Sequence, residues 1–533
     1  MGRALDLNFL RENFKELVWG DKKSFDLYLY SNEDPRSFHK EGSDFIVALG
    51  SLIYKNRIGR EAVKSFYDDL KLYDLKTLLL SDHIHGQFCI LLYRDNQVKI
   101  VTDKIGYFAL YAYNRNNNVE ISNSFLVVAK NNETTISNVG VGQYISENVA
   151  GHACCNKNIV KEVEYLEGGN IYCVVNGKME SEKYYDLKDD LKIGKYDDPN
   201  EIAFLETRAI LDNLAFLSSI KGEVFADLTG GVDTRSNLAH LLEMKACHRT
   251  GVQIPVEYEH YTNTGQYSEY AIIKQISERF DLDLHIYGDK SFLEDIDHIK
   301  NTAFYFTNKQ TYNRRTGYFL DLRQKDIGIL ISGLTGTELH RQPYIEYFDN
   351  NQQLDLNDFV PQYYPLIDVF NENFLKEDEF FQETIRFIGK GIDGLDYDLA
   401  EDLGAYIDYI AFFRTHFCRY FGLASSIVPF YTTYGDFSVV KLLMQTTHKA
   451  KKRFSIQRRI LTRLNKDLSS MDCTRGFPLT MVNEQNFHRF GNMIDNNIPQ
   501  QYITEETMKE EREVKEKIKY YFQNTKEFYE EFR

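Results

Sequence analysis

The stretch Glu-Val-Phe-Ala-Asp-Leu-Thr-Gly-Gly-Val-Asp-Thr-Arg, residues 223–235, is the one around which the rest of the chain is organised. A short run with β character stops at Gly230 and Gly231, and a run with helical character, residues 236–242, follows without a break. Adjacent glycines allow positive φ and let a ligand approach the main chain closely. Successive N–H groups at the start of a helix bind phosphate oxygens. The stretch therefore predicts a phosphate-binding turn between a strand and a helix.

Polar side chains around the two glycines strengthen this prediction. Thr229 and Thr234 supply hydroxyl groups, and Asp233 supplies a carboxylate for Mg²⁺. The alternative is an ordinary strand–turn–helix corner, which a lone Gly-Gly pair would favour. The pattern hydroxyl–Gly–Gly–x–Asp–hydroxyl is far more specific than such a pair. A phosphate site is therefore the preferred interpretation.

Residues 229–234, Thr-Gly-Gly-Val-Asp-Thr, resemble the Ser-Gly-Gly-x-Asp-Ser pyrophosphate loop (PP-loop) of N-type ATP pyrophosphatases, and most closely that of the asparagine synthetase-like ligases. Both serines are threonines here, which keeps the hydroxyl groups. Arg235 directly after the loop is similar to asparagine synthetase-related proteins found with surface-polysaccharide genes. The resemblance implies ATP and Mg²⁺ as cofactors. It also implies that Thr229, Gly230, Gly231, Asp233 and Thr234 bind the nucleotide.

A second glycine-rich element, residues 329–341, reads Ile-Leu-Ile-Ser-Gly-Leu-Thr-Gly-Thr-Glu-Leu-His-Arg. Again a β-branched strand enters a glycine turn and a helix. The element resembles the Ser-Gly-x-Gly-x-Asp-Glu segment that completes the pyrophosphate and metal site in the same ligases. Ser332, Gly333 and Glu338 match that segment, so the resemblance makes Ser332 and Gly333 cofactor-binding residues.

Three replacements separate this second element from the family pattern. Thr335 stands for the second glycine, and Thr337 stands where the family has a Mg²⁺-binding aspartate. Threonine is a weak neutral ligand, so Asp233 and Glu338 are expected to hold the metal. Leu334 occupies the position that is acidic in asparagine synthetases and tyrosine in β-lactam synthetases. It argues against either of those two products.

Two arginines late in the chain are candidate catalytic cations, together with Glu338. Residues 457–461, Gln-Arg-Arg-Ile-Leu, place Arg458 where the family has a lysine that neutralises charge at the α-phosphate. An arginine there can stabilise a phosphate but cannot shuttle a proton. The alternative for Arg458 is a solvated basic helix face. Arg475 lies in a segment that resembles a late Arg-x-x-Gly-Phe motif, and it is the second anionic-ligand candidate.

The first 190 residues are expected to be rich in strands, with turn dipeptides such as Asp95–Asn96 between them. Residues 86–111 resemble the glutaminase-type domain of asparagine synthetases, with Asp103 and Gly106 in matching positions. The activity does not carry over, because a nucleophilic N-terminal cysteine is required and this chain has Gly2 after Met1. Residues 1–195 are therefore predicted to form a degenerate, Ntn-hydrolase-like β-sandwich with helices.

Residues 189–199 are charged and end in proline, which suits a linker. Asn200 is a candidate N-cap for a helix over residues 201–220 that leads into the first glycine turn. These features predict a domain boundary near residue 195. Residues 196–533 are predicted to form a doubly wound α/β domain of the PP-loop ATP pyrophosphatase type. It would have a parallel sheet, ATP at the carboxyl ends of the strands, and further helices over residues 396–445.

Composition sets limits on the partners. The chain of 533 residues carries a net charge of −16, which argues against a nucleic-acid partner. Its seven cysteines are scattered without zinc-ligand spacing, and no apolar run near the N-terminus is long enough to span a bilayer. A cytoplasmic location and no membrane span are therefore expected.

The resemblance implies an ATP-dependent amide-forming ligase. It would adenylate a substrate carboxylate, release pyrophosphate and transfer the acyl group to an amine or to ammonia, possibly from a separate glutaminase. β-Lactam synthetases and lasso-peptide cyclases follow similar logic. One alternative is an ammonia-using amidotransferase acting on a surface-polysaccharide sugar acid. Another is a catalytically silent scaffold that binds nucleotide, and a third, sulfur transfer to RNA, is disfavoured by the acidic charge and the lack of a catalytic cysteine pair.

Overall fold

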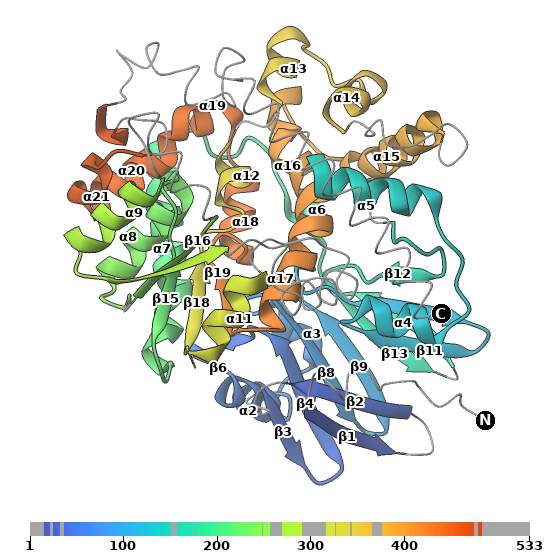
Figure 1. Ribbon diagram of the computed structural model, residues 1–533. Coiled ribbons are helices and arrows are strands. Elements are labelled where there is room, and N and C mark those ends of the chain that lie inside the picture. The colour runs from blue at the N-terminus through green and yellow to red at the C-terminus, as the bar shows by residue number, and fades with distance from the viewer. Residues whose placement is uncertain are drawn as a thin grey trace.

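The computed structural model describes residues 15–21, 25–31, 37–150, 157–175, 177–247, 249–255, 269–289, 316–325, 327–341, 344–364, 376–473 and 478–481. Figure 1 shows the antiparallel strands of the N-terminal region, in blue and cyan, below and to the right of a parallel sheet. Helices surround the parallel sheet. The predicted combination of an antiparallel region and a parallel α/β region is therefore confirmed.

The N-terminal region contains a six-stranded antiparallel sheet and a three-stranded one. The larger sheet has the order β14-β13-β9-β8-β4-β3, and the smaller has the order β11-β10-β12. Asp95 and Asn96 join β8 to β9 with φ values of 53° and 59°, as expected for a tight hairpin turn. The strands are β3 (Phe38–Glu41), β4 (Asp44–Gly50), β8 (Phe88–Arg94), β9 (Gln97–Thr102), β10 (Tyr111–Arg115), β11 (Asn118–Ser122), β12 (Val163–Tyr165), β13 (Asn170–Val175) and β14 (Lys178–Lys183).

Alternating side chains of β8 explain how this region is layered. Phe88, Ile90 and Leu92 pack with α2 (Arg60–Asp69) and α3 (Leu75–Leu80) on one face of the larger sheet. Cys89 lies on the other face, in a cluster shared with residues of the smaller sheet. A third cluster joins the smaller sheet to α4 (Phe125–Asn131). The region is thus a β-sandwich with helices on both outer faces.

Smaller elements complete the N-terminal region. A two-stranded hairpin and a three-stranded sheet of order β6-β5-β7 stand apart from the two main sheets. These elements are β1 (Lys15–Asp21), β2 (Phe25–Ser31), β5 (Ile53–Tyr54), β6 (Arg57–Ile58), β7 (Ile84–His85), α5 (Asn138–Ala150) and α6 (Leu187–Asp190).

The second region is built on a five-stranded parallel sheet of order β17-β16-β15-β18-β19. All four residues of β15 and all four of β18 are buried, because helices cover both faces of such a sheet. The strands are β15 (Val224–Asp227), β16 (Arg249–Pro255), β17 (Asp283–Asp289), β18 (Ile329–Ser332) and β19 (Phe430–Thr432).

Strand order reverses between β15 and β18. The chain moves outward from β15 to β16 and β17, then crosses to β18 on the opposite side of β15. Helices α8 (Val232–Glu243) and α9 (Glu269–Arg279) lie on one side of the sheet in Figure 1, and α11 (Thr316–Gln324) lies on the other. This is the predicted doubly wound arrangement, in which ligands bind at the carboxyl ends of the strands where the order reverses.

Helix α7 (Pro199–Asn213) corrects the expected start of this region. Its N-cap is Asp198, whose carboxylate accepts a hydrogen bond from the Asn200 N–H, so the predicted cap at Asn200 was wrong. Proline suits the first helical position because its missing N–H would be unpaired there anyway. The helix ends at Asn213, earlier than expected, and a 3₁₀ segment, η1 (Leu214–Ser219), leads toward β15.

The remaining helices follow β18 and β19. The expected helical stretch over residues 396–445 is interrupted by β19, which pairs with β18 from residue 430 onward. A π-helical segment, η5, joins α16 to α17. The elements are α12 (Gly336–His340), α13 (Ile345–Asn350), α14 (Leu356–Tyr363), α15 (Glu377–Ile392), η4 (Ala400–Leu403), α16 (Gly404–Asp408), η5 (Tyr409–Phe417), α17 (Cys418–Ser425), α18 (Phe437–Met444), α19 (His448–Lys451), η6 (Lys452–Phe454), α20 (Ser455–Leu464), α21 (Lys466–Ser470) and η7 (Leu479–Met481).

The antiparallel region contacts the edge strand β19 directly. The Gln87 side-chain amide donates to the Thr432 carbonyl at 3.2 Å, and its oxygen accepts from the Thr432 N–H at 3.3 Å. The Ser51 hydroxyl donates to the Phe430 carbonyl. Leu191 and Ile193 are buried in the core of the parallel region, so this part of the expected linker is packed. A boundary at residue 195 stays a prediction.

A search of the described residues for membrane-crossing helices finds none of sufficient length and apolar character.

Candidate functional site at the carboxyl ends of β15 and β18

The first glycine-rich turn is folded back on itself by its two threonines. The Thr229 N–H donates to the Thr234 hydroxyl oxygen at 2.9 Å, and the two hydroxyl oxygens are 2.9 Å apart. The Gly231 N–H donates to the Thr229 hydroxyl oxygen at 3.2 Å. These contacts fix the backbone that leads from β15 into α8.

Gly231 has a different role from the one the sequence suggested. Its φ is −75° and its ψ 174°, so the expectation of positive φ was wrong at this residue. A Cβ at Gly231 would lie 3.2 Å from the Thr229 hydroxyl oxygen, which is a crowded contact. Gly231 is the N-cap of α8, and no side chain caps the helix. The start of α8 is therefore suited to an anion.

The second glycine-rich turn packs against the first. A Cβ at Gly333 would lie 2.9 Å from both the nitrogen and the Cα of Thr234. The Ser332 hydroxyl donates to the Asp227 carboxylate at 3.0 Å and accepts from the Leu334 N–H at 3.2 Å. The two predicted turns are therefore adjacent in space, with Gly333 at the point of closest approach.

Thr335, which stands for the second glycine of the family motif, adopts a left-handed backbone with φ of 71°. β-branched residues rarely take this conformation, which costs roughly 1–3 kcal/mol. The Thr335 hydroxyl donates to the Leu334 carbonyl at 2.6 Å, and the side chain is buried. The glycine-like backbone of the motif is thus kept without the glycine.

Asp233, the expected metal ligand, lies between the two turns and α20. Its Oδ2 accepts a hydrogen bond from the Thr337 hydroxyl, and its Oδ1 accepts one from the Gln457 side-chain amide at 2.5 Å. Each carboxylate oxygen keeps a further lone pair. Gln457 is completely buried, so its contact with Asp233 is shielded from water.

Glu338 lies near enough to Asp233 for the two charges to interact. Burial and, to a smaller extent, the negative charge of Asp233 raise the pKa of Glu338 to about 7. A cation between the two carboxylates would relieve this repulsion. Mg²⁺ is commonly held by one or two carboxylates together with phosphate oxygens and water. The donor set of Asp233, Glu338 and the Thr337 hydroxyl therefore fits a magnesium ion that arrives with a nucleotide.

Comparisons with known proteins leave the family open. No family model matches the chain. No curated protein matches it either.

Among solved structures, an NMN synthetase from Francisella tularensis is 16% identical, with 41% of this chain and 93% of that chain covered and a TM-score of 0.19. The allosteric regulatory enzyme of purine biosynthesis is 10% identical, with 49% of this chain and 63% of that chain covered and a TM-score of 0.18. The glutamine phosphoribosylpyrophosphate amidotransferase from B. subtilis is 11% identical, with 47% and 48% covered and a TM-score of 0.16. Scores this low carry no argument about function.

The three arginines singled out in the sequence have different surroundings. Arg458 lies on α20, half-buried, one residue beyond the Gln457 that contacts Asp233. Arg235 is fully buried and donates to the carbonyls of Met471 and Asp472 at 2.7 and 2.6 Å. Its role is therefore to anchor the chain that follows α21. Arg475 lies outside the described residues.

Two groups at the site were not predicted from the sequence. Gln457 was overlooked in favour of the charged Arg458 beside it. The second group is the pair Glu206 and His340, in which the His340 ring nitrogen lies 3.0 Å from both carboxylate oxygens and both side chains are buried. Burial lowers the pKa of His340, but the charge of Glu206 and the hydrogen bond to it, together with smaller contributions from Asp233 and the Gly336 carbonyl, give a net rise. The sequence signal for Glu206 is its place four residues from both Ile202 and Ile210, on the buried face of α7.

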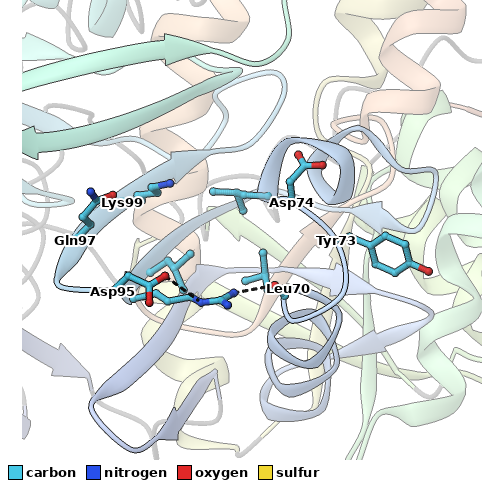
Figure 2. Close-up of a pocket in the computed structure, with 9 residues that line it drawn as sticks. Leu70, Tyr73, Asp74, Asp95, Gln97 and Lys99 are labelled. Atoms are coloured by element: carbon cyan, nitrogen blue, oxygen red, sulfur yellow. Dashed lines mark hydrogen bonds and ion pairs between the residues drawn. The ribbon is translucent and has the colours of Figure 1, made fainter.

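A cavity of about 250 Å³ lies elsewhere, in the N-terminal region, as Figure 2 shows. It is bordered by the chain after α2 and by β8 and β9, and the Arg94 guanidinium donates across it to the Leu70 carbonyl at 2.7 Å. Tyr73, Asp74 and Lys99 also line it. None of the predicted site residues is among its lining residues, so it is unrelated to the glycine-rich turns.

Proposed function

We propose that this protein is an ATP-dependent ligase that adenylates a carboxylate, releases pyrophosphate and transfers the acyl group to an amine or ammonia. The observation that carries the proposal is the convergence of two glycine-rich turns at the strand-order reversal, with Asp233 and Glu338 beside them. This is the position where open α/β sheets bind their ligands. A scaffold without chemistry would not need two carboxylates held in mutual repulsion.

The residues of the site have distinct parts in this proposal. The backbone from Thr229 to Thr234 and the start of α8 would bind the pyrophosphate oxygens, with Ser332 and Gly333 bringing the second turn against them. Asp233 and Glu338 would hold Mg²⁺, which supplies charge neutralisation for the departing pyrophosphate. Gln457 and Thr337 orient Asp233 through their hydrogen bonds.

Cations would complete the charge balance at the α-phosphate. Arg458 and Arg475 are our candidates, and an arginine at either place would stabilise phosphate oxygens through paired hydrogen bonds. We assign these steps to a domain of residues 196–533. Residues 1–195 would form an Ntn-type domain without glutaminase activity, which the sandwich with outer helices supports. The alternative function, an amidotransferase that acts on a surface-polysaccharide sugar acid, would use the same reaction steps with ammonia as the acceptor.

Two measurements on wild type and Asp233→Ala test the proposal. Calorimetry measures binding of ATP with Mg²⁺, and an assay of pyrophosphate release then screens pooled carboxylates together with amines. We expect wild type to bind and release pyrophosphate and Asp233→Ala to lose at least about 10-fold in affinity, since a metal ligand is removed. Asp212→Ala is the control, because Asp212 is exposed and pairs only loosely with Arg208 at 3.7 Å. Binding by wild type without any pyrophosphate release would favour the scaffold, and no binding at millimolar ATP would refute the nucleotide site.

A further inference from the structure

Four buried ionisable side chains lie beside the glycine-rich turns and take no part in the steps above. They are Glu206 from α7, Asp402 from η4, Asp408 from α16 and Lys451 from α19. Their exposed fractions are 0%, 8%, 9% and 3%. Asp408 is near enough to Glu338 for its charge to act on that side chain, and Glu206 contacts His340 of α12. The group therefore adjoins the proposed nucleotide site.

The three carboxylates have partners of their own. Glu206 is bonded to the His340 ring at 3.0 Å, and Asp402 accepts from the His448 N–H at 2.8 Å. Asp408 accepts a hydrogen bond from the Tyr344 hydroxyl. Within the described part of the chain, by contrast, no hydrogen bond or ion pair ends at the Lys451 ammonium, although all three carboxylates act on its charge. Burying the charged form of this lysine costs free energy, unless the side chain loses its proton or a ligand pairs with its charge.

The surroundings of Lys451 make the neutral form accessible. Burial lowers the pKa of Lys451 to about 8, against the opposing effect of Asp402, Glu206 and Asp408. A lysine of this kind can accept a proton near neutral pH, which an exposed lysine or an arginine cannot do.

The charges that face this group favour a cationic ligand. Among the described residues no ion pair ends at Asp402 or Asp408, whereas Glu206 is paired with His340. On its own helix, His448 is neutral at physiological pH, because burial and then the charges of Lys452 and Lys451 lower its pKa to about 3. Burial raises the pKa of Asp408 to about 7, against the opposing charges of Arg341 and Lys451, and burial also raises the pKa of Asp402. A cationic ligand beside these two side chains would favour the charged form of both.

Building on the proposed ligase activity, we propose that these residues form the acceptor site: a primary amine enters as a cation between Asp402 and Asp408, and Lys451 is the general base that deprotonates it. The proton moves from the substrate ammonium to the Lys451 amine, which leaves a neutral nucleophile. The amine nitrogen then attacks the acyl carbon of the adenylate, the carbon–nitrogen bond forms, and the carbon–oxygen bond to AMP breaks with its electron pair leaving on the AMP phosphate. The second nitrogen proton passes to water.

The test uses two nucleophiles that differ in charge near neutral pH. Methylamine is a cation that must lose a proton, whereas hydroxylamine is already neutral. With the carboxylate donor identified by pyrophosphate release, amide formation would be measured for wild type, Lys451→Arg and Lys451→Met. The control is Lys449→Arg, on the same helix but 79% exposed and paired with Asp197.

We expect Lys451→Arg and Lys451→Met to lose about 100-fold or more in kcat with methylamine while reacting with hydroxylamine within a few-fold of wild type. The wild-type rate with methylamine should rise with pH toward a plateau above about 8. Lys449→Arg should match wild type with both nucleophiles.

Equal loss with both nucleophiles in the Lys451 variants would overturn the general-base role and leave a structural one. Full activity of Lys451→Arg with methylamine would overturn it too, because charge alone would then suffice. Lys451→Met keeps the test valid if the arginine does not fit, because its rate with hydroxylamine reports separately whether the site is still intact. If wild type releases no pyrophosphate with any carboxylate, the ligase proposal itself fails, and that outcome is distinct from a failure of the acceptor site.

Discussion

The Thr337 hydroxyl donates a hydrogen bond to the Asp233 carboxylate and so joins the two glycine-rich turns through side chains. A threonine can make this contact without adding charge. An aspartate at the same position, as in the resembling ligases, would place two carboxylates against each other. The number of negative charges beside Asp233 therefore depends on the residue at position 337.

Thr337→Asp tests that relationship. Without Mg²⁺ the variant should have a lower melting temperature than wild type, because like charges would meet beside Asp233. Millimolar Mg²⁺ should raise the melting temperature of the variant more than that of wild type. Thr337→Asn is the uncharged control. If Mg²⁺ raised the melting temperature of Thr337→Asp no more than that of wild type, the prediction would be contradicted.

Gly333→Ala should destabilise the protein. The added Cβ would meet the Thr234 backbone at 2.9 Å, and a backbone cannot move aside as a side chain can. We expect a loss of about 1–3 kcal/mol in the free energy of unfolding, measured by denaturant titration. Gly389→Ala, in helix α15, is the matched control, because its Cβ would meet only the Leu356 side chain at 3.5 Å. Equal stability of the two variants would show that the turns are less closely packed than described.

Thr335→Asn should stabilise the second turn. Asparagine adopts left-handed backbone more readily than a β-branched residue does, and it is similar in size to threonine. We expect a gain of about 1 kcal/mol in the free energy of unfolding. Thr335→Val should be less stable than wild type, since it keeps the branched side chain and loses the hydrogen bond to the Leu334 carbonyl. A decrease in stability for the asparagine variant would count against strain at this residue.

His85 and Asp436 should give the protein a pH-dependent stability. Burial lowers the pKa of His85, but the charge of Asp436 at a nitrogen–oxygen distance of 3.5 Å, the hydrogen bond to it and a backbone hydrogen bond at Asp82 together outweigh burial, so the pKa lies above 6.5 when folded. This contribution is complete below pH 6.5 and is lost as the pH rises through the folded pKa. Thermal unfolding between pH 6 and 9 should therefore show a decline in wild type that His85→Gln lacks. If the melting temperatures of wild type and His85→Gln changed in parallel between pH 6 and 9, the proposed contribution of this pair would be refuted.

Much of the fold followed from local patterns. Two runs of buried β-branched and apolar residues ended in glycine, and each entered a helix, which was enough to predict the strands and turns at β15 and β18. The Asp95–Asn96 turn was equally visible. Contacts between distant segments were not, because periodicity carries no information about which side chain faces which turn. Gln457 lies 224 residues from Asp233, and only the packing of α20 on α8 brings them together.

Single-residue roles were harder to predict than elements. A charged Arg458 drew attention from the neutral Gln457 because cations suit phosphate chemistry. Gly231 was expected to permit positive φ, yet its φ is −75° and a side chain there would crowd the Thr229 hydroxyl. Arg235 matched a family signature, but its guanidinium binds main-chain carbonyls near the end of α21. In each case the chemical properties of the residue type were judged correctly, but the sequence did not show which groups the residue would contact.

Gln87 has a consequence for how the chain avoids misassembly. Strand β19 is the outer strand of the parallel sheet, and its free N–H and C=O groups would otherwise present a template for a strand from another molecule. The Gln87 amide and the Ser51 hydroxyl occupy those groups at Thr432 and Phe430. A C-terminal half produced by itself would leave this edge bare. The N-terminal region thus covers the backbone groups of β19 through which a strand of another molecule could pair.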